Sequence, residues 1–187
     1  MANSPELSRR GLVAAAVLAA VPFAALGYAT AAGDLSTLAT VHVWTATVWT
    51  GAVIAVGFGL APTLRERSVD GTVSLVARTA PLAVTVLPSM ALVTVAGGLR
   101  LGAAYGLFSP VDSLTWAVLG ATSAVLVVAF GLALPRDLRV CRELAAADTD
   151  RERVARLSTR TATLLTVQGS FQLALLFLMS RVAEQAG

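Results

Sequence analysis

The residues that could bind a metal ion or a cofactor are few in this sequence, and each can be named. His42 is the single histidine, and Met90 and Met179 are the methionines that follow the initial one. Imidazole and thioether groups suit Cu(I) or a haem iron, and they suit magnesium or calcium poorly. The sequence therefore indicates a copper ion or a haem iron, with His42 and Met179 as candidate ligands and Met90 as a further candidate for copper.

The spacing of polar residues places several of them on shared helix faces. Trp49 follows His42 by seven residues, so both side chains lie on one face of a helix, and Trp49 would line the same site. Gln168, Gln172 and Met179 follow one another at spacings of four and seven, so they also share a face. His42 and Met179 each lie within about two turns of the same end of their apolar stretches. We expect these two residues to converge on one site that opens outward.

Arg100 ends an apolar stretch near the level of His42 and offers a different kind of contact. Its guanidinium could pair with a propionate of haem b, for which His42 would be the axial ligand and Met179 the ligand opposite. Each of these residues also has a purely structural explanation. Methionine fills cores, histidine and glutamine form hydrogen bonds between helices, and arginine extends to the lipid headgroups.

Several kinds of chemistry are excluded by residues that the sequence lacks. A single histidine cannot ligate a haem iron from both sides, and all 14 basic residues are arginine, which excludes a Schiff base to lysine. The lone Cys141 excludes a disulfide framework and a cysteine-rich metal cluster. Nucleotide-binding, metalloprotease and serine-hydrolase motifs do not occur in the sequence. A binding or transfer role is therefore favoured over an enzymatic one.

The composition of the chain is that of a membrane protein. Of its 187 residues, 56% are hydrophobic and only 13% are charged, whereas soluble domains carry roughly 25% charged residues. The formal net charge is +3, which is too small to indicate a nucleic-acid partner. We expect a small integral membrane protein whose first partner is the lipid bilayer.

Charged residues divide the sequence into five long uncharged stretches. A helix needs about 20 apolar residues to cross the hydrocarbon layer, and each stretch reaches that length. We therefore predict an all-α fold with five transmembrane helices in a single membrane domain over residues 1–187. The predicted spans are 11–33, 36–62, 81–104, 113–135 and 161–181, and the segment 136–160 is predicted to be a cytoplasmic helical hairpin. The stretch 11–33 has the alternative interpretation of a cleaved signal peptide.

The arginines orient the predicted helices. If the N-terminus is cytoplasmic, twelve of the 14 arginines lie on the cytoplasmic side, and Arg100 and Arg181 lie outside. Cytoplasmic loops of membrane proteins carry such an excess of basic residues. We predict a multi-pass protein of the cell membrane with a cytoplasmic N-terminus and an outside C-terminus. Its spans would form an antiparallel four-helix bundle preceded by one further helix.

A helix start is predicted shortly before the last span. Residues 149–152 have the pattern of a capping box, in which a threonine hydroxyl and a glutamate carboxylate bind the unpaired amides of the first turn. This pattern predicts Thr149 as the N-cap of a helix from about Asp150 to Ala183. Such a helix is longer than one membrane thickness.

Residues 42–51, HVWTATVWTG, have the form H-x6-W-x-G. This string resembles the first helix of the four-helix membrane domain of the copper-resistance protein D (CopD) family, and it is distantly similar to the HemJ-type protoporphyrinogen oxidases. In both families the histidine helix is followed by a basic loop and then by a helix that ends in small residues, as residues 96–99 do here. The likeness covers residues 35–181. It implies copper handling or haem b binding, with His42 as ligand and Trp49 and Gly51 as packing partners.

Three functional hypotheses follow. The first is a membrane protein that binds copper ions and transfers them across or within the membrane, at an outward-facing site. The second is a haem b protein with His42 as axial ligand. The third is a non-catalytic accessory subunit in which His42 is structural. In that case the helices would pack against a larger membrane complex or against further copies of the chain.

Overall fold

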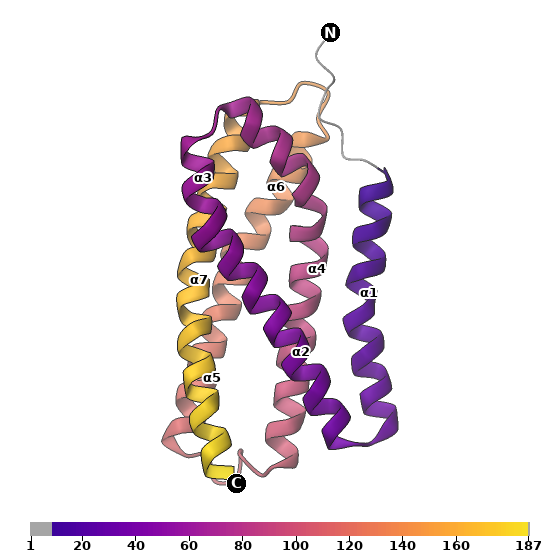
Figure 1. Ribbon diagram of the computed structural model, residues 1–187, viewed down its shortest axis with the longest axis vertical. Coiled ribbons are helices and arrows are strands. Elements are labelled where there is room, and N and C mark those ends of the chain that lie inside the picture. The colour runs from indigo at the N-terminus through magenta and orange to yellow at the C-terminus, as the bar shows by residue number, and fades with distance from the viewer. Residues whose placement is uncertain (1–8, 187) are drawn as a thin grey trace.

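The computed structural model describes residues 9–186 of the protein, so residues 1–8 and 187 of the predicted domain lie outside the described residues. Within this range every regular element is a helix, as Figure 1 shows. The predicted all-helical class and the number of candidate spans are confirmed. Five helical stretches of the described range are long and apolar enough to cross a membrane: Gly11–Ala32, Leu35–Glu66, Val69–Ala104, Ser113–Leu144 and Arg151–Val182.

A tight turn connects the first two helices, α1 (Arg9–Ala32) and α2 (Leu35–Ile54). Gly33 takes a φ of +68°, a left-handed conformation that glycine adopts without strain. Asp34 then caps α2, since its carboxylate accepts hydrogen bonds from the backbone N–H groups of Ser36 and Thr37. This turn sets the direction in which α2 leaves α1.

The second helical stretch contains a π-helical segment. This segment, η1, covers Ala55–Leu60, and α3 follows over Ala61–Glu66, about one turn beyond the predicted end at 62. α4 covers Val69–Ala104, and the Ser68 hydroxyl accepts a hydrogen bond from the Gly71 backbone N–H at its start. α4 therefore begins well before the predicted boundary at 81 and continues through both of its prolines.

The fourth stretch is interrupted by a π-helical segment as the second is, whereas the fifth is a single helix. α5 covers Ser113–Leu126, and a second π-helical segment, η2, covers Val127–Ala133. α6 covers Leu134–Leu144, and α7 covers Arg151–Ala186. Asp112 caps α5, because its carboxylate accepts a hydrogen bond of 2.7 Å from the backbone N–H of Thr115. The segment 136–160 thus contains the end of one long helical stretch and the start of the next.

The cap of α7 differs from the prediction. The backbone N–H of Arg153 donates to the Asp150 carboxylate at 2.9 Å, and that of Val154 donates to the Asp150 carbonyl at 3.0 Å. Asp150 is therefore the N-cap residue, and the prediction of Thr149 was wrong by one position. Threonine and aspartate are both favoured at N-caps, but here the Thr149 hydroxyl donates to the Ala146 carbonyl in the turn that precedes the helix.

The helices are longer than the uncharged stretches from which the spans were predicted. α4 has Asp70 in its first turn, and α7 starts with Arg151 and Glu152. Charged residues mark where a helix leaves the hydrocarbon layer. They do not end the helix, because charged side chains are tolerated in helices and several of them favour helix formation. Ion pairs also connect the helices at this end. Arg151 Nε lies 2.8 Å from the Asp70 carboxylate, and Arg153 pairs with Glu143 at 3.5 Å.

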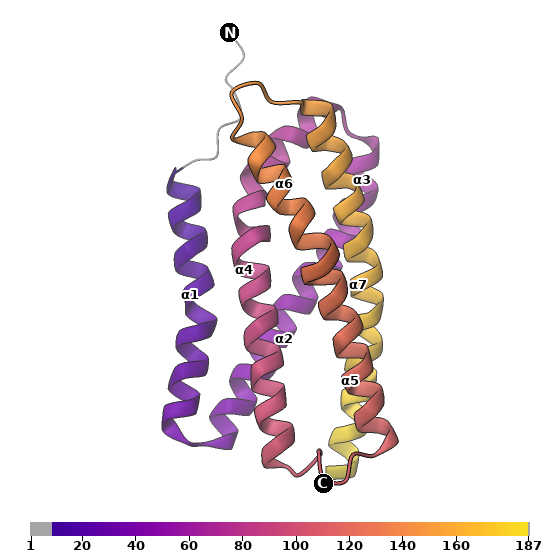
Figure 2. The same cartoon turned by 180° about the vertical axis from the view of Figure 1, so that it is seen from behind.

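The long helices run side by side, with successive stretches in opposite directions (Figures 1 and 2). The α3–α4 and α6–α7 connections lie at one end, which we call the basic end because of its arginines. The α1–α2 turn and the α4–α5 loop lie at the other, which we call the distal end. α2 crosses the molecule diagonally, from α1 at the distal end to α7 at the basic end, while α1 packs along α4.

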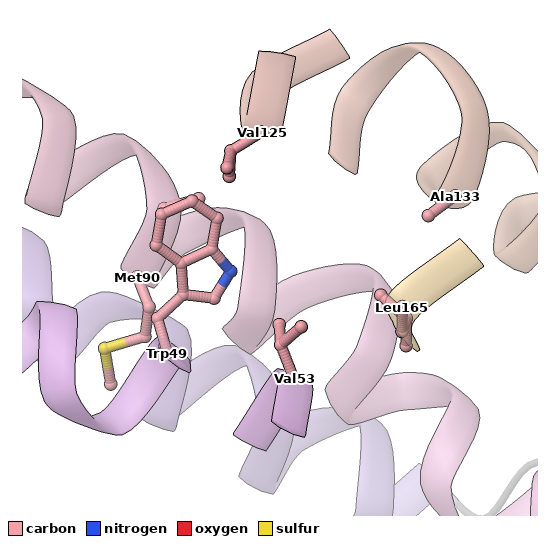
Figure 3. Close-up of a cluster of buried hydrophobic side chains, with 7 residues drawn as sticks. Trp49, Val53, Met90, Val125, Ala133 and Leu165 are labelled. Atoms are coloured by element: carbon pink, nitrogen blue, oxygen red, sulfur yellow. The ribbon is translucent and has the colours of Figure 1, made fainter. Parts of the chain in front are cut away.

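A buried apolar cluster joins α2, α4, α5, η2 and α7 (Figure 3). It consists of Trp49, Val53, Met90, Ala91, Val125, Ala133 and Leu165. The outer surface, in contrast, exposes large apolar side chains, among them Val17, Phe23, Trp44 and Phe177. An apolar exterior around helices of this length is typical of proteins that lie in a lipid bilayer.

Candidate functional site

The hydrogen bond of His42 determines which of its ring nitrogens is free. Nδ1 lies 2.8 Å from the backbone carbonyl oxygen of Thr94 in α4. A carbonyl can only accept, so Nδ1 carries the proton and donates it, which leaves the lone pair on Nε2. In the described part of the chain Nε2 forms no hydrogen bond. A partly buried imidazole in this state can bind a metal ion through Nε2.

Two glycines of α4 make room for the His42 ring. A Cβ atom added at Gly97 would lie 3.3 Å from the His42 Cβ, and one added at Gly98 would lie 2.8 Å from the His42 Cε1. The second distance is shorter than ordinary Cβ contacts, so alanine at Gly98 would displace the ring. We call the surface formed by Thr94, Gly97 and Gly98 the His42 slot.

A pair of hydroxyl groups holds α2 against α4 next to the His42 slot. Thr94 Oγ1 donates to Thr45 Oγ1 at 3.0 Å, and Thr45 Oγ1 donates to the Val41 carbonyl at 2.9 Å. Thr45 is completely buried, and its hydroxyl has both a donor and an acceptor. The helix that carries the imidazole is therefore held in place on the α4 surface. Histidines that bind metals commonly donate their other ring N–H to a backbone carbonyl, which orients the ring.

Trp49 and Met90 are core residues. Trp49 is 4% exposed and Met90 is 6% exposed, and Figure 3 shows both in the buried cluster. Met90 is one helical turn before Thr94 in α4, at the level of Trp49 rather than of His42. Methionine packs well beside aromatic rings. Gly51, which the resemblance implies as a packing partner, would meet no atom within 4 Å if it carried a Cβ.

Met179 and Arg100 have partners or surroundings other than His42. Met179 lies on α7 and is 36% exposed. Arg100 donates from its guanidinium to the Thr30 hydroxyl of α1 at 2.9 Å, so it joins α4 to α1. In the described part of the chain, the hydrogen bonds of the His42 ring and backbone carbonyl to side chains or across helices involve only α4 and its own helix. The convergence of His42 and Met179 therefore stays a prediction.

Two carboxylates at the distal end are held in the charged form. The hydroxyl and the backbone N–H of Thr37 donate to Asp34, and these hydrogen bonds lower the pKa of Asp34 below its ordinary value of 3.8. Hydrogen bonds from Thr115 lower the pKa of Asp112 in the same way. Both groups are caps of helices, so the charge at the distal end is tied to the turns that position α2 and α5.

A small cavity in the interior was missed by sequence reasoning. It has a volume of about 30 Å³, and Trp49, Pro88, Asp137 and Gln168 are among the residues that line it. Gln168 is 1% exposed, and its Oε1 has no hydrogen-bond partner in the structure. A cavity of this size has room for about two water molecules. The sequence singled out Gln168 but not Asp137, which follows a long apolar stretch and could have been noticed for that reason.

Comparisons with known proteins give no match to set beside this geometry. No protein-family model, no curated protein and no solved structure matches the chain. Among the residues whose placement the structure gives, no group of three or more His, Cys, Asp or Glu side chains could hold a metal ion. The resemblance of residues 42–51 to the CopD and HemJ families stays a resemblance of one short stretch, and the site is interpreted from its contacts.

Proposed function

We propose that the basic end of the molecule faces the cytoplasm and that the distal end faces outward from the cell membrane. The two connections of the basic end are flanked by arginines on both sides, from α3, α4, α6 and α7. Between residues 11 and 182, only Arg100 and Arg181 lie toward the distal end. An excess of basic residues of this kind is found on the cytoplasmic side of membrane proteins. His42 then belongs to the outward half.

We further propose that the protein binds copper ions at His42 Nε2. One observation carries this proposal: Nδ1 donates to the Thr94 carbonyl, so the ring is oriented and Nε2 keeps its lone pair. The tight contact between the ring and Gly98 supports it, because the site holds the imidazole in one place. Copper is favoured over zinc because the sulfur candidates that go with His42 are methionines, whose thioethers select Cu(I).

A single imidazole is not a complete copper site, so further ligands are needed. Met90 is enclosed in the buried cluster around Trp49, whereas Met179 is exposed on the outside of α7. We therefore propose that a second copy of the chain, or a membrane-protein partner, completes the coordination of copper. An exposed methionine at the same end of another copy is suited to that role. Copper would be cargo that the protein passes on, and the protein would act by binding it rather than by catalysis.

Copper binding by the purified full chain tests this proposal. Cu(I) would be offered without oxygen in competition with a coloured chelator, and the copper retained per chain would be measured. We expect His42→Ala to abolish retention. Gly98→Ala keeps the imidazole but displaces it, so it should weaken binding roughly tenfold, which corresponds to about 1.4 kcal/mol. Gly120→Ala is the matched control, since an added Cβ there meets no atom within 4 Å.

Three outcomes would contradict the proposal or redirect it. Retention of copper by His42→Ala at the wild-type level would show that the histidine is not a ligand. A Soret absorption band in the spectrum of the purified wild type would favour the haem b hypothesis over copper. Wild-type protein that holds neither copper nor haem would favour the accessory-subunit hypothesis. Helical circular dichroism of each variant shows whether a loss of binding reflects a loss of fold.

A further inference from the structure

A groove at the basic end is bordered by arginines from two parts of the chain. Its volume is about 390 Å³, and it lies between the α3–α4 connection and the first turns of α7. Arg65 and Arg67 border it on one side, and Arg156 and Arg160 border it on the other. In the described part of the chain, no acidic residue is among those that line it. We call it the arginine groove.

Two of the four guanidinium groups have no partner of their own. Arg65 donates to the Thr163 hydroxyl at 3.1 Å, which holds it against α7, and Arg156 pairs with Glu152 at 3.3 Å. Arg67 and Arg160 form neither an ion pair nor a side-chain hydrogen bond within the described residues. Positive charges gathered around a concave surface attract anions more strongly than the same charges on a flat one.

The arginine groove also has an apolar part. Leu64, Val69 and Ala155 line it together with the arginines. Leu64 is buried against Ala61 and Ala162, so it forms a firm base, while Val69 is exposed. A groove with charged sides and an apolar base fits a molecule that carries a phosphate and a hydrocarbon part. A free inorganic anion would make no use of the apolar part.

The position of the groove along the helices suits a lipid headgroup. α3 ends at Glu66 and α4 begins at Val69, so the groove lies where two candidate spans meet at the basic end. Basic pockets between helices at this level of a membrane bind anionic headgroups, and guanidinium groups bind phosphate through two parallel hydrogen bonds. We propose that the arginine groove binds the phosphate group of an anionic phospholipid, with Arg67 and Arg160 as its principal contacts.

Lipid binding by the purified full chain in neutral detergent tests this proposal. Phosphatidylglycerol, phosphatidylcholine and inorganic phosphate would be titrated separately, and bound molecules would be counted by native mass spectrometry. We expect phosphatidylglycerol to bind well above phosphatidylcholine and inorganic phosphate, and added salt to weaken it. The double variant Arg67→Gln with Arg160→Gln should lose roughly tenfold or more in affinity.

A second double variant separates the groove from general surface charge. Arg139→Gln with Arg142→Gln removes the same charge from exposed positions of α6 at the same end, outside the groove. Equal losses in both double variants would show diffuse attraction and overturn the proposal. Inorganic phosphate that binds as tightly as phosphatidylglycerol would overturn the lipid assignment. If the groove double variant fails to fold, Arg160→Gln alone gives the same test, because its side chain has no partner to lose.

Discussion

Glycines lie where α2 crosses α4 and where its π-helical continuation, η1, crosses α7. The two crossings differ in which atoms occupy the space beside the glycines. Toward the distal end, Gly97 and Gly98 of α4 receive the His42 ring. Toward the basic end, Gly57 of η1 lies against the backbone of α7, where an added Cβ would stand 2.6 Å from the Leu165 carbonyl carbon. One crossing accommodates a side chain, and the other brings two backbones into direct contact.

The two crossings also differ in the polar group that lies at the glycine contact. At the α7 crossing, the Thr166 hydroxyl donates to the Gly57 carbonyl at 2.6 Å. π-Helical segments interrupt the regular backbone hydrogen bonds, and this hydroxyl satisfies a carbonyl of η1. At the α4 crossing, the Nε2 of His42 is unpaired within the described residues. The contact at Gly57 therefore only holds two helices together. At the His42 slot, the imidazole keeps a nitrogen that can bind a ligand.

The largest expected effect is on the α7 crossing. Gly57→Ala places a methyl group on backbone atoms that cannot rotate away, so we expect it to lower the free energy of unfolding by about 3 kcal/mol. Gly59→Ala, in the same π-helical segment, is the matched control because an added Cβ meets nothing within 4 Å. Unfolding in denaturant with the protein in detergent measures both. Equal stability of the two variants would mean that the backbones are not in contact.

A smaller effect on stability is expected from removing a paired polar side chain near the α4 crossing. Removing an unpaired one near the α7 crossing should have almost no effect. Thr45→Val removes the acceptor of the buried Thr94 hydroxyl, so it should cost about 1–2 kcal/mol of stability. Gln168→Leu removes an oxygen that has no partner, so it should be nearly neutral or stabilising. Thermal unfolding of the two variants side by side makes the comparison. A large loss from Gln168→Leu would show that the small cavity contains a bound partner of Gln168, such as water.

The smallest expected effect concerns the turn that positions α2 and hence the His42 slot. The pKa of Asp34 is lowered in the folded state, so its capping contribution is fully present above its ordinary value of 3.8. The contribution is lost as the pH falls through the lowered folded value. Asp34→Asn keeps the cap without the charge, so its melting temperature should fall less over this acidic range than that of the wild type. Parallel curves for the two proteins would contradict this assignment.

The fold class could be predicted from the sequence because it depends on composition and on the length of apolar stretches. Five candidate spans follow from five uncharged stretches, but the helix ends do not, because helices such as α4 continue into charged residues. The two π-helical segments could not be predicted. Gly57 of η1 lies against α7, which is distant in the sequence, and no local pattern reveals that contact.

The candidate site was predictable only in part. His42 is notable in the sequence because it is the single histidine, and the small residues 96–99 were noted through the resemblance. Their contact with the imidazole depends on how α2 crosses α4, which no spacing within one helix reveals. Met90 shows the opposite case. Its residue type suits copper and a core equally well, and only its position beside Trp49 shows that it packs in the core.

The π-helical segment η1 makes the chain tolerant of the loss of a single residue. A π-helical turn contains an extra residue relative to an α-helical turn, and each residue of an α-helix advances the chain by about 100° around the axis. A deletion within Ala55–Leu60 would restore an ordinary helix and leave Arg65 and Arg67 in nearly the same direction, because the wider π-helical turn absorbs the extra residue. His42, which precedes the segment, would keep its orientation. A deletion between His42 and η1, in the α-helical part of α2, would instead turn the groove arginines by about 100° relative to the histidine.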